Sequence, residues 1–431
     1  MKLRKKVAQV CYVTNKKTNF VAIEKKMKFI TIGAFTLFIS ANALLAQSVS
    51  LKTGVYNARL QLNQTTALPV RLKVEKQQKS TVLVISNAEE RIELKATKKA
   101  GDSLVFSFPN FDSELRVVAT KKRHLKGYWI NFNKANNYRI PFEAHLQSSS
   151  AQPAAAGTDI GGKWEAYFSP KTNDQETAVG LFNQINNTIT GTFLTETGDY
   201  RFLEGVIEGS SFYVSCFDGS HAFLMTGSVE KETIQGTFYS GKHYQTTWSA
   251  SRNETFELSN PDSLTFLKEN ESQVKFTLSD LAGNNYSYPN STTEDKVVII
   301  QIMGTWCPNC MDETKYYKEL YATYHDQGLE IISIGYEAAE TFEEQAAKIK
   351  RLQERHKLDF TFLVGGKANK GKASEDFEML NEVISFPTTI FIGRDGSVKR
   401  IHTGFNGPGT GKYYTEYVEK TNALIEALLA E

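Results

Sequence analysis

Residues 297–310 read VVIIQIMGTWCPNC, and this stretch decides the fold of the C-terminal part of the chain. Its first seven residues are nearly all apolar, which predicts a strand buried on both faces. A helix is expected from about Asn309 to Asp326, so Cys307 and Cys310 lie where the strand ends and the helix begins. Further strands and helices alternate after it and end in a hairpin and a closing helix. This order indicates an α/β sheet domain.

The spacing of the two cysteines favours redox chemistry. Two intervening residues let both sulfurs meet within one helical turn, so a disulfide forms without rearrangement of the backbone. Cys307 would lie at the helix N-terminus, where unpaired N–H groups and the helix dipole favour the thiolate. Cys310 would lie one turn deeper and be shielded. We therefore expect Cys307 to attack the partner disulfide and Cys310 to resolve the mixed disulfide.

Two other roles for the pair stay open, a zinc half-site and a pair of inert buried cysteines. Structural zinc takes about four ligands, and the sequence has no second close cysteine pair. Of the four cysteines in the chain, Cys11 lies in the leader and Cys216 stands alone. A metal site at Cys216, His221 and His243 is a weak hypothesis, because their spacing fits no common cluster. We expect neither a metal nor another cofactor.

Several further motifs accompany the cysteine pair. Gly304-Thr305-Trp306-Cys307 leads into it, Glu313 follows Cys310 by three residues, and Phe386-Pro387-Thr388-Thr389 lies near the terminal hairpin. Phe276–Gly283 forms an opening strand and turn. Together these motifs resemble the TlpA/ResA-like branch of the thioredoxin superfamily. The resemblance covers about residues 274–431 and does not extend to the N-terminal region.

The resemblance implies a thioredoxin-like domain with thiol-disulfide oxidoreductase activity. It implies a cis bond before Pro387, beside the cysteine pair. A cis X-Pro bond is uncommon in folded proteins and is usually a conserved feature. It also implies that Phe386, Pro308 and Thr388 contact an extended substrate segment. Glu313 would tune the acidity of the cysteines and their proton transfer, since a carboxylate in such a place raises nearby thiol pKa values.

Two positions near the pair need separate interpretation. Trp306 is expected to cover the disulfide. Thioredoxin itself has a buried Asp five residues before this tryptophan, and Gln301 stands at that place here. Because a neutral amide cannot accept a proton from Cys310, the role of proton acceptor shifts to Glu313. The departure argues against a housekeeping thioredoxin.

Two other activities are disfavoured by single residues. The segment Gly407–Lys412 is glycine-rich, but Asn406 precedes it where a phosphate-binding loop needs Gly, and Tyr413 follows where Ser or Thr is needed. We therefore expect no nucleotide binding. A peroxidase would carry Thr three residues before the nucleophile, and Gly304 stands there.

The first 46 residues are predicted to be a leader with a signal peptide. They carry a net charge of +8, against −6 for the rest of the chain, which gives no reason to expect nucleic-acid binding. A basic segment, an apolar run over residues 29–40 and small residues near Ala43–Ala46 follow the order of a secretory signal. We expect cleavage there and a periplasmic or cell-envelope location, with a retained membrane anchor as the less favoured alternative. Met27 as the true start is a hypothesis.

Two β-rich regions are expected between the leader and the redox domain, at residues 47–146 and 158–260. A small, polar linker at 147–157 separates them. Short alternating runs punctuated by Gly, and a recurring Gly-x-aromatic pattern, predict antiparallel barrels or sandwiches. The predicted fold class is therefore α+β and multidomain, with an N-terminal antiparallel β barrel or sandwich region followed by a thioredoxin-like α/β domain at 271–431.

The sequence thus predicts an exported thiol-disulfide oxidoreductase that exchanges disulfides with protein thiols. The resemblance favours a reductase recharged by a membrane electron donor. Two alternatives stay open. In one, the β region makes the protein an envelope binding or scaffold protein with an accessory redox domain. In the other, the redox domain is a disulfide oxidase.

Overall fold

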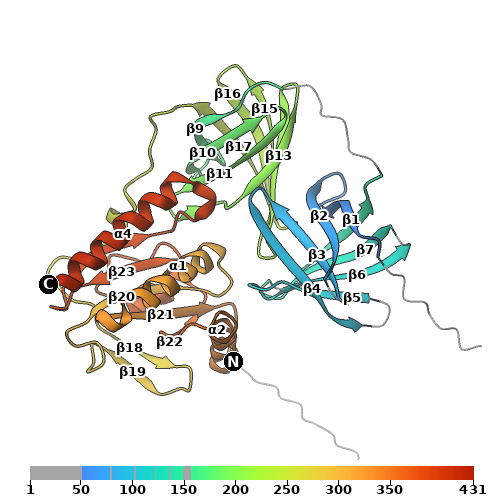
Figure 1. The fold of residues 1–431 in the computed structure, drawn as a ribbon. Helices are drawn as coiled ribbons and strands as arrows, with labels where there is room; N and C mark the ends of the chain where they lie inside the picture. Colours follow the sequence, from blue (N-terminus) through green and yellow to red (C-terminus); the bar gives the residue numbers. More distant parts are fainter. Residues whose placement is uncertain (1–50, 78–79, 101–102, 122, 135–136, 149–156) are drawn as a thin grey trace, which may run out of the picture. The chain divides into compact units, whose positions relative to one another are not determined.

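The computed structural model describes residues 51–77, 80–100, 103–121, 123–134, 137–148 and 157–431. Their strands form two antiparallel sheets and one mixed sheet that carries the α-helices (Figure 1). This arrangement confirms the predicted fold class. The predicted leader, its cleavage region, Met27 and residues 149–156 of the predicted linker lie outside the described residues. No helix of the described part is both long enough and apolar enough to cross a membrane.

The first sheet is a closed barrel of eight antiparallel strands, in which β1 pairs with both β2 and β8. Alternation along each strand places one set of side chains inside: in β1, Tyr56, Ala58 and Leu60 are buried and their neighbours are not. The strands are β1 Gly54–Gln61, β2 Ala67–Gln77, β3 Ser80–Asn87, β4 Glu90–Ala100, β5 Ser103–Ser107, β6 Ser113–Lys121, β7 His124–Asn131 and β8 Arg139–Leu146.

The second sheet also closes on itself, because β10 pairs with β11 as well as with β9. Its interior is aromatic, with Trp164, Phe193 and Trp248 fully buried. The strands are β9 Gly162–Phe168, β10 Glu176–Ile185, β11 Thr188–Thr195, β12 Gly198–Asp199, β13 Leu203–Glu208, β14 Ser211–Phe217, β15 Ala222–Glu230, β16 Thr233–Ser240 and β17 Tyr244–Arg252.

The Gly-x-aromatic pattern has a steric cause in this second barrel. A Cβ on Gly191 would lie 2.0 Å from a backbone oxygen of β10, and one on Gly236 would lie 2.0 Å from a backbone oxygen of β15. Both positions therefore need a residue without a side chain. The aromatic residue two positions later, Phe193 or Phe238, points to the same face of the strand and fills the barrel interior.

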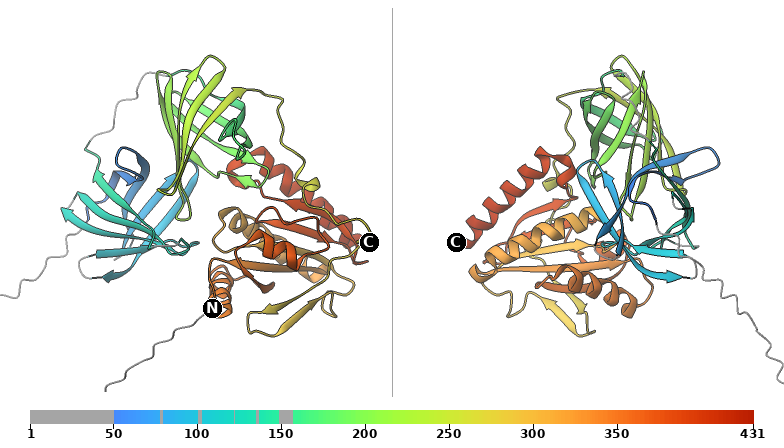
Figure 2. Two further views of the ribbon diagram at one scale, coloured as in Figure 1. Left: turned by 180° about the vertical axis from the view of Figure 1, so that it is seen from behind. Right: turned by 45° about the vertical axis from the view of Figure 1, so that its right-hand side comes forward.

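The C-terminal domain is a seven-stranded sheet in the order β19-β18-β22-β21-β20-β23-β24, with β20, β21 and β22 parallel. Helices α1, α2 and α4 contribute to one hydrophobic cluster and α3 to another. Both views of Figure 2 show these helices against this sheet. The elements are β18 Phe276–Asp280, β19 Asn285–Tyr288, β20 Val297–Met303, α1 Pro308–Tyr324, β21 Leu329–Glu337, α2 Phe342–His356, β22 Thr361–Lys367, α3 Lys370–Asp376, β23 Thr388–Ile392, β24 Val398–Thr403 and α4 Lys412–Ala430.

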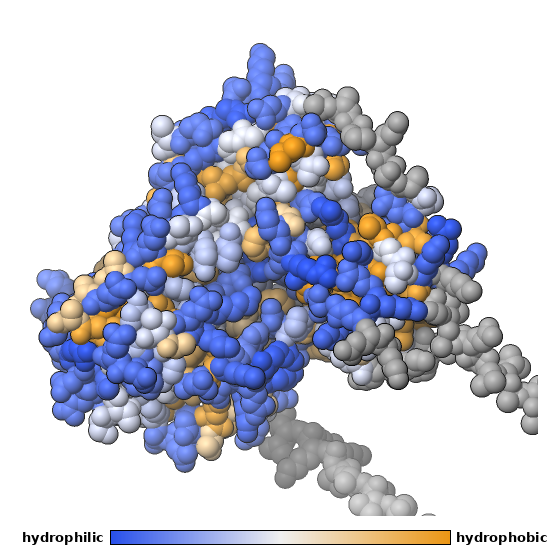
Figure 3. Space-filling view, viewed as in Figure 1, coloured by the Kyte–Doolittle hydropathy of each residue, from blue (hydrophilic) through white to orange (hydrophobic). Residues whose placement is uncertain are grey.

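The predicted strand at residues 297–303 is β20, and all seven of its residues are buried. It pairs with β21 on one side and β23 on the other, so it is central in the sheet. The apolar side chains are thereby largely enclosed, and the face drawn in Figure 3 is mostly hydrophilic with apolar residues in small groups. The buried strand β20 ends four residues before Cys307, so the cysteine pair lies just beyond the carboxyl end of this central strand.

Candidate active site

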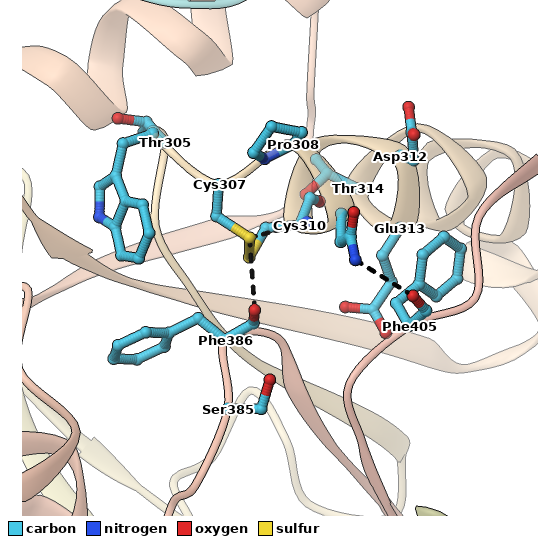
Figure 4. The surroundings of a disulfide bond; sticks show 12 residues. Thr305, Cys307, Pro308, Cys310, Asp312, Glu313, Thr314, Ser385, Phe386 and Phe405 are labelled. Carbon is cyan, nitrogen blue, oxygen red and sulfur yellow. Dashed lines mark hydrogen bonds between the residues drawn. A yellow bond between two sulfur atoms is a disulfide. The ribbon is translucent and has the colours of Figure 1, made fainter. Parts of the chain in front are cut away.

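The two cysteines lie at the start of α1, as the sequence predicted, and form a disulfide with a Cα–Cα distance of 5.3 Å (Figure 4). Cys307 is the N-cap of the helix, and the backbone N–H of Cys310 donates a hydrogen bond to its Sγ at 3.2 Å. This donor and the helix dipole both favour a negative charge on that sulfur. Cys310 is fully buried, whereas Cys307 keeps 6% of its surface exposed. The geometry therefore suits Cys307 for attack and Cys310 for resolution.

A second segment approaches the disulfide from the start of β23. The Phe386–Pro387 peptide bond is cis, as the resemblance implied, and the carbonyl oxygen of Phe386 lies 3.3 Å from the Sγ of Cys307 (Figure 4). Thr388 is buried and its hydroxyl donates to the carbonyl of Ser385 at 2.9 Å. The structure thus brings Phe386 against the cysteine pair. The roles of Pro387, Phe386 and Thr388 toward a substrate stay predictions.

Trp306 and Pro308 flank Cys307 in sequence and are both tied to neighbouring elements. The indole N–H of Trp306 donates to the carbonyl of Tyr336 at 2.9 Å, and its ring lies edge-on to Phe386 with centroids 5.9 Å apart. Pro308 is the first residue of α1 and is buried. Trp306 therefore lies between β21 and the cis-proline segment, and its role as a cover over the disulfide stays a prediction.

Glu313 lies on α1 and is fully buried. Its carboxylate accepts hydrogen bonds from Gln301, Thr389 and Tyr317 at 2.8–3.0 Å and from Tyr417 at 3.3 Å. Burial raises its pKa to about 7, although these four donors oppose that shift. Through its hydrogen bond, the Gln301 amide helps to fix the position of the Glu313 carboxylate. Among the described residues, the hydrogen bonds of Glu313 go to these side chains and not to a cysteine sulfur, so its redox role stays a prediction.

Replacing Glu313 with glutamine is expected to change how stability depends on pH. A folded pKa of about 7 lies above the unfolded value of about 4.3. The folded state therefore binds this proton more tightly, and the free energy of unfolding falls as pH rises from about 4.5 to 7. The fall amounts to about 3 kcal/mol and is absent in Glu313→Gln. Denaturant unfolding at several pH values measures the difference between the two proteins.

Exposed Glu319→Gln, on the same helix, is the matched control and should give a curve parallel to that of the unchanged protein. Other buried acids contribute equally to both proteins and cancel in the difference. A Glu313→Gln curve that also runs parallel across this range would contradict the raised pKa.

A second buried acid, Glu337, was not anticipated from the sequence. It ends β21 and accepts hydrogen bonds from the backbone N–H and the hydroxyl of Thr305 at 2.8 and 2.6 Å. Burial raises its pKa to about 7. The carboxylate holds the turn that leads from β20 to Trp306. The one sequence feature that could have pointed to Glu337 is its place as an acidic residue at the end of an apolar strand.

Loops that follow strands of the second barrel contact the cysteine segment. The described residues belong to one compact unit, Ser48–Glu431. The hydroxyl of Ser220 donates to the carbonyl of Trp306 at 2.9 Å, and the Asn309 amide donates to the carbonyl of Asp199 at 3.2 Å. The hydroxyl of Ser385, next to the cis bond, donates to the carbonyl of Thr197 at 2.8 Å. Residues of the second barrel therefore lie against Trp306, Asn309 and Ser385, which are next to the disulfide and the cis bond.

Arg201 is the charged centre of this contact. Its guanidinium is 5% exposed and pairs with Asp312 of α1, Glu90 of β4 and Asp218 after β14. It also donates to the carbonyl of Pro308 at 3.5 Å. Burial alone would lower the pKa of Arg201, but the three carboxylates hold it above its ordinary value. One side chain of the second barrel region therefore connects the first barrel with helix α1 beside the cysteines.

The glycine-rich segment at residues 407–412 serves the same contact. The backbone N–H of Gly407 donates to the Asp199 carboxylate at 2.6 Å, and α4 begins directly afterwards. Asp199 is buried, which raises its pKa to about 6. An internal carboxylate is therefore the hydrogen-bond partner of this N–H group.

The weak metal hypothesis for Cys216, His221 and His243 finds no support in the described residues, because these three do not come together as a cluster. Cys216 is buried in β14, and burial raises the pKa of its thiol well above the ordinary value. His221 lies 3.4 Å from Asp218, while His243 contacts Tyr138 of the first barrel.

Known proteins match the C-terminal domain. The AhpC/TSA family matches residues 270–401. The thiol-disulfide oxidoreductase ResA of Halalkalibacterium halodurans is 31% identical over 134 residues, which are 31% of this chain and 68% of the relative. The thioredoxin-like protein YneN of Bacillus subtilis is 25% identical over 138 residues, which are 32% of this chain and 73% of the relative. The family match leaves out both barrels.

Solved structures match a slightly larger share of the chain. A thioredoxin-family thiol:disulfide interchange protein from Chlorobium tepidum has 16% sequence identity and a TM-score of 0.28, and covers 37% of this chain and 97% of that one. The thioredoxin domain of a Bacteroides vulgatus thiol-disulfide oxidoreductase has 19% identity and a TM-score of 0.26, and covers 36% of this chain and 99% of that one.

The sequence relatives and the geometry of the site lead to one assignment. A disulfide caps a helix after a buried central strand, a cis-proline segment lies against it, and the ResA match spans about two thirds of that relative. Through its C-terminal domain, the chain belongs to the ResA/TlpA-like thiol-disulfide oxidoreductases.

Proposed function

We propose that this protein is an exported protein-disulfide reductase that cycles Cys307 and Cys310 between dithiol and disulfide. The observation that carries the proposal is the disulfide at the N-terminus of α1, with the carbonyl of Phe386 3.3 Å from the outer sulfur. That carbonyl belongs to the residue before a cis-proline, where an extended peptide can pair with the backbone.

The proposed reaction moves two electrons from the protein to its substrate. The Cys307 thiolate attacks one sulfur of the substrate disulfide, and the other substrate sulfur leaves as a thiolate. Cys310 then loses its proton and attacks the Sγ of Cys307, which releases the second substrate sulfur. The substrate ends as a dithiol and Cys307–Cys310 as a disulfide. A donor of two electrons and two protons must then restore the dithiol, and we propose a membrane protein for that step.

The two β barrels are proposed to act with the redox domain as one functional unit. Ser220, Asp199 and Arg201 of the second barrel region contact residues 306–312 directly. This supports control of access to Cys307 over a separate scaffold function. A substrate large enough to pair with Phe386 would have to displace the loops that contact Ser385 and Asn309.

The reduction potential of the Cys307–Cys310 pair tests the proposed direction of electron flow. We expect a value near or below that of thioredoxin, about −270 mV, when the protein from Gln47 onward is equilibrated with glutathione buffers. A value near that of DsbA, about −120 mV, would make the protein an oxidase instead. If the titration showed no two-electron couple, the proposed redox function would be contradicted.

A further inference from the structure

A cluster of two histidines and one glutamate lies on the outside of the first barrel, in the strands β7 and β8. His124 and His145 are directly opposite each other in the pairing of these strands, and Glu143 lies two residues before His145 on the same face. All three offer a ligand atom within 4.8 Å of the others. None of them takes part in the redox site. We propose that His124, Glu143 and His145 form a binding site for Zn²⁺.

The distances in the cluster fit a small tetrahedral cation. The Nε2 of His124 lies 3.0 Å and the Nε2 of His145 3.3 Å from the same oxygen, Oε1 of Glu143. Ligand atoms 2.0–2.1 Å from a tetrahedral zinc are about 3.3 Å apart. The two imidazole rings are stacked with centroids 3.9 Å apart, so both edges face the carboxylate together. Two imidazole nitrogens and a carboxylate oxygen are a common zinc ligand set, with the fourth position left for water.

Neighbouring side chains orient the ligand atoms from behind. The hydroxyl of Thr120 lies 2.8 Å from Nδ1 of His124, which directs Nε2 toward the carboxylate. Arg59 donates to the other carboxylate oxygen, Oε2, at 2.8 Å and leaves Oε1 facing the imidazoles.

Lys126 is the one competitor for the same oxygen in the described surroundings of the cluster. Its Nζ lies 3.3 Å from Oε1 of Glu143, and its side chain is 58% exposed. A bound zinc would repel this ammonium, which has open solvent into which it can turn. If zinc binds here, removal of the Lys126 ammonium should strengthen zinc binding, whereas removal of a histidine should weaken it.

Calorimetric titration of the purified full chain with Zn²⁺ tests the site, with Cys307–Cys310 kept as the disulfide so that this pair binds no metal. We expect one zinc per chain. His145→Asn and His124→Asn should each weaken binding at least about tenfold, and Thr120→Val should weaken it about tenfold through the lost orientation of His124. Lys126→Ala should tighten binding. Visible absorption of a Co²⁺-substituted sample reports the tetrahedral geometry.

His325→Asn is the matched control. His325 faces a single carboxylate, Glu330, at 3.6 Å, so this substitution should leave the affinity unchanged. His145 is 56% exposed at its side chain, so its replacement should leave the fold intact, which circular dichroism checks. The proposal is overturned if no stoichiometric binding occurs, if both histidine variants bind as before, or if Lys126→Ala weakens binding.

Discussion

Replacing Cys307 with serine is expected to lower the rate of disulfide exchange on the order of a thousandfold or more, because the reacting nucleophile is lost. Replacing Cys310 with serine should leave the first attack intact and stop the reaction at the mixed disulfide. The reason lies in the geometry. Cys307 caps α1, accepts the N–H of Cys310 and retains some exposure, whereas Cys310 is fully buried. Mass spectrometry of each variant after incubation with a peptide disulfide measures the trapped adduct.

The control is Cys216→Ser, the remaining cysteine of the described chain. Its thiol is buried in β14, where burial raises its pKa well above the ordinary value, so the exchange rate should not change. The assignment of roles would be reversed if Cys307→Ser accumulated the mixed disulfide and Cys310→Ser did not react.

The local features of the redox site were predictable from the sequence because each depends on neighbours in the chain. An apolar run makes β20, and the residues after it make the N-terminus of α1 with Cys307 as its cap. The cis bond before Pro387 came from a resemblance and not from a local pattern, yet it lies where that resemblance placed it. Glu313 was found the same way. Its four hydrogen-bond donors, however, come from four elements, three of them other than its own helix, so the sequence around Glu313 does not reveal them.

Features that depend on strand register or on contacts between sheets were not predictable. His124 and His145 meet only because β7 and β8 pair in one register, and a shift by one residue would place them on opposite faces. Arg201 and Asp312 are 111 residues apart, and neither stands in a motif. Arg201 also has a positive φ of 59°, an uncommon backbone state for a bulky residue that no sequence pattern indicates.

Arg201 is the position where a single substitution should most reduce the stability of the fold. It is buried, and its three carboxylate partners also have little exposed surface: their side chains are exposed by 15% in Glu90, 1% in Asp218 and 7% in Asp312. Removal of the guanidinium would leave three carboxylates close together, of which only Asp312, through Lys315 at 2.9 Å, and Asp218, through His221 at 3.4 Å, keep a basic neighbour. Breaking a buried ion pair from one side costs about 3–5 kcal/mol.

Arg201→Met, which keeps much of the volume, is therefore expected to lower the free energy of unfolding by about 3–5 kcal/mol in denaturant titrations at neutral pH. The loss should shrink on acidification, because protonated carboxylates no longer need the cation. Arg91→Met is the matched control. Arg91 pairs with Glu75 and Glu93 but is 46% exposed, and exposed pairs contribute little to stability, so the free energy of unfolding should hardly change. Reduced Arg201→Met should also be alkylated faster at Cys307, because the guanidinium no longer joins Pro308 and Asp312 to the second barrel. If Arg201→Met is destabilised but its Cys307 is alkylated at the unchanged rate, Arg201 has a structural role only. If the free energy of unfolding does not change, the expected stabilisation by the contact of Arg201 with its three carboxylates is contradicted.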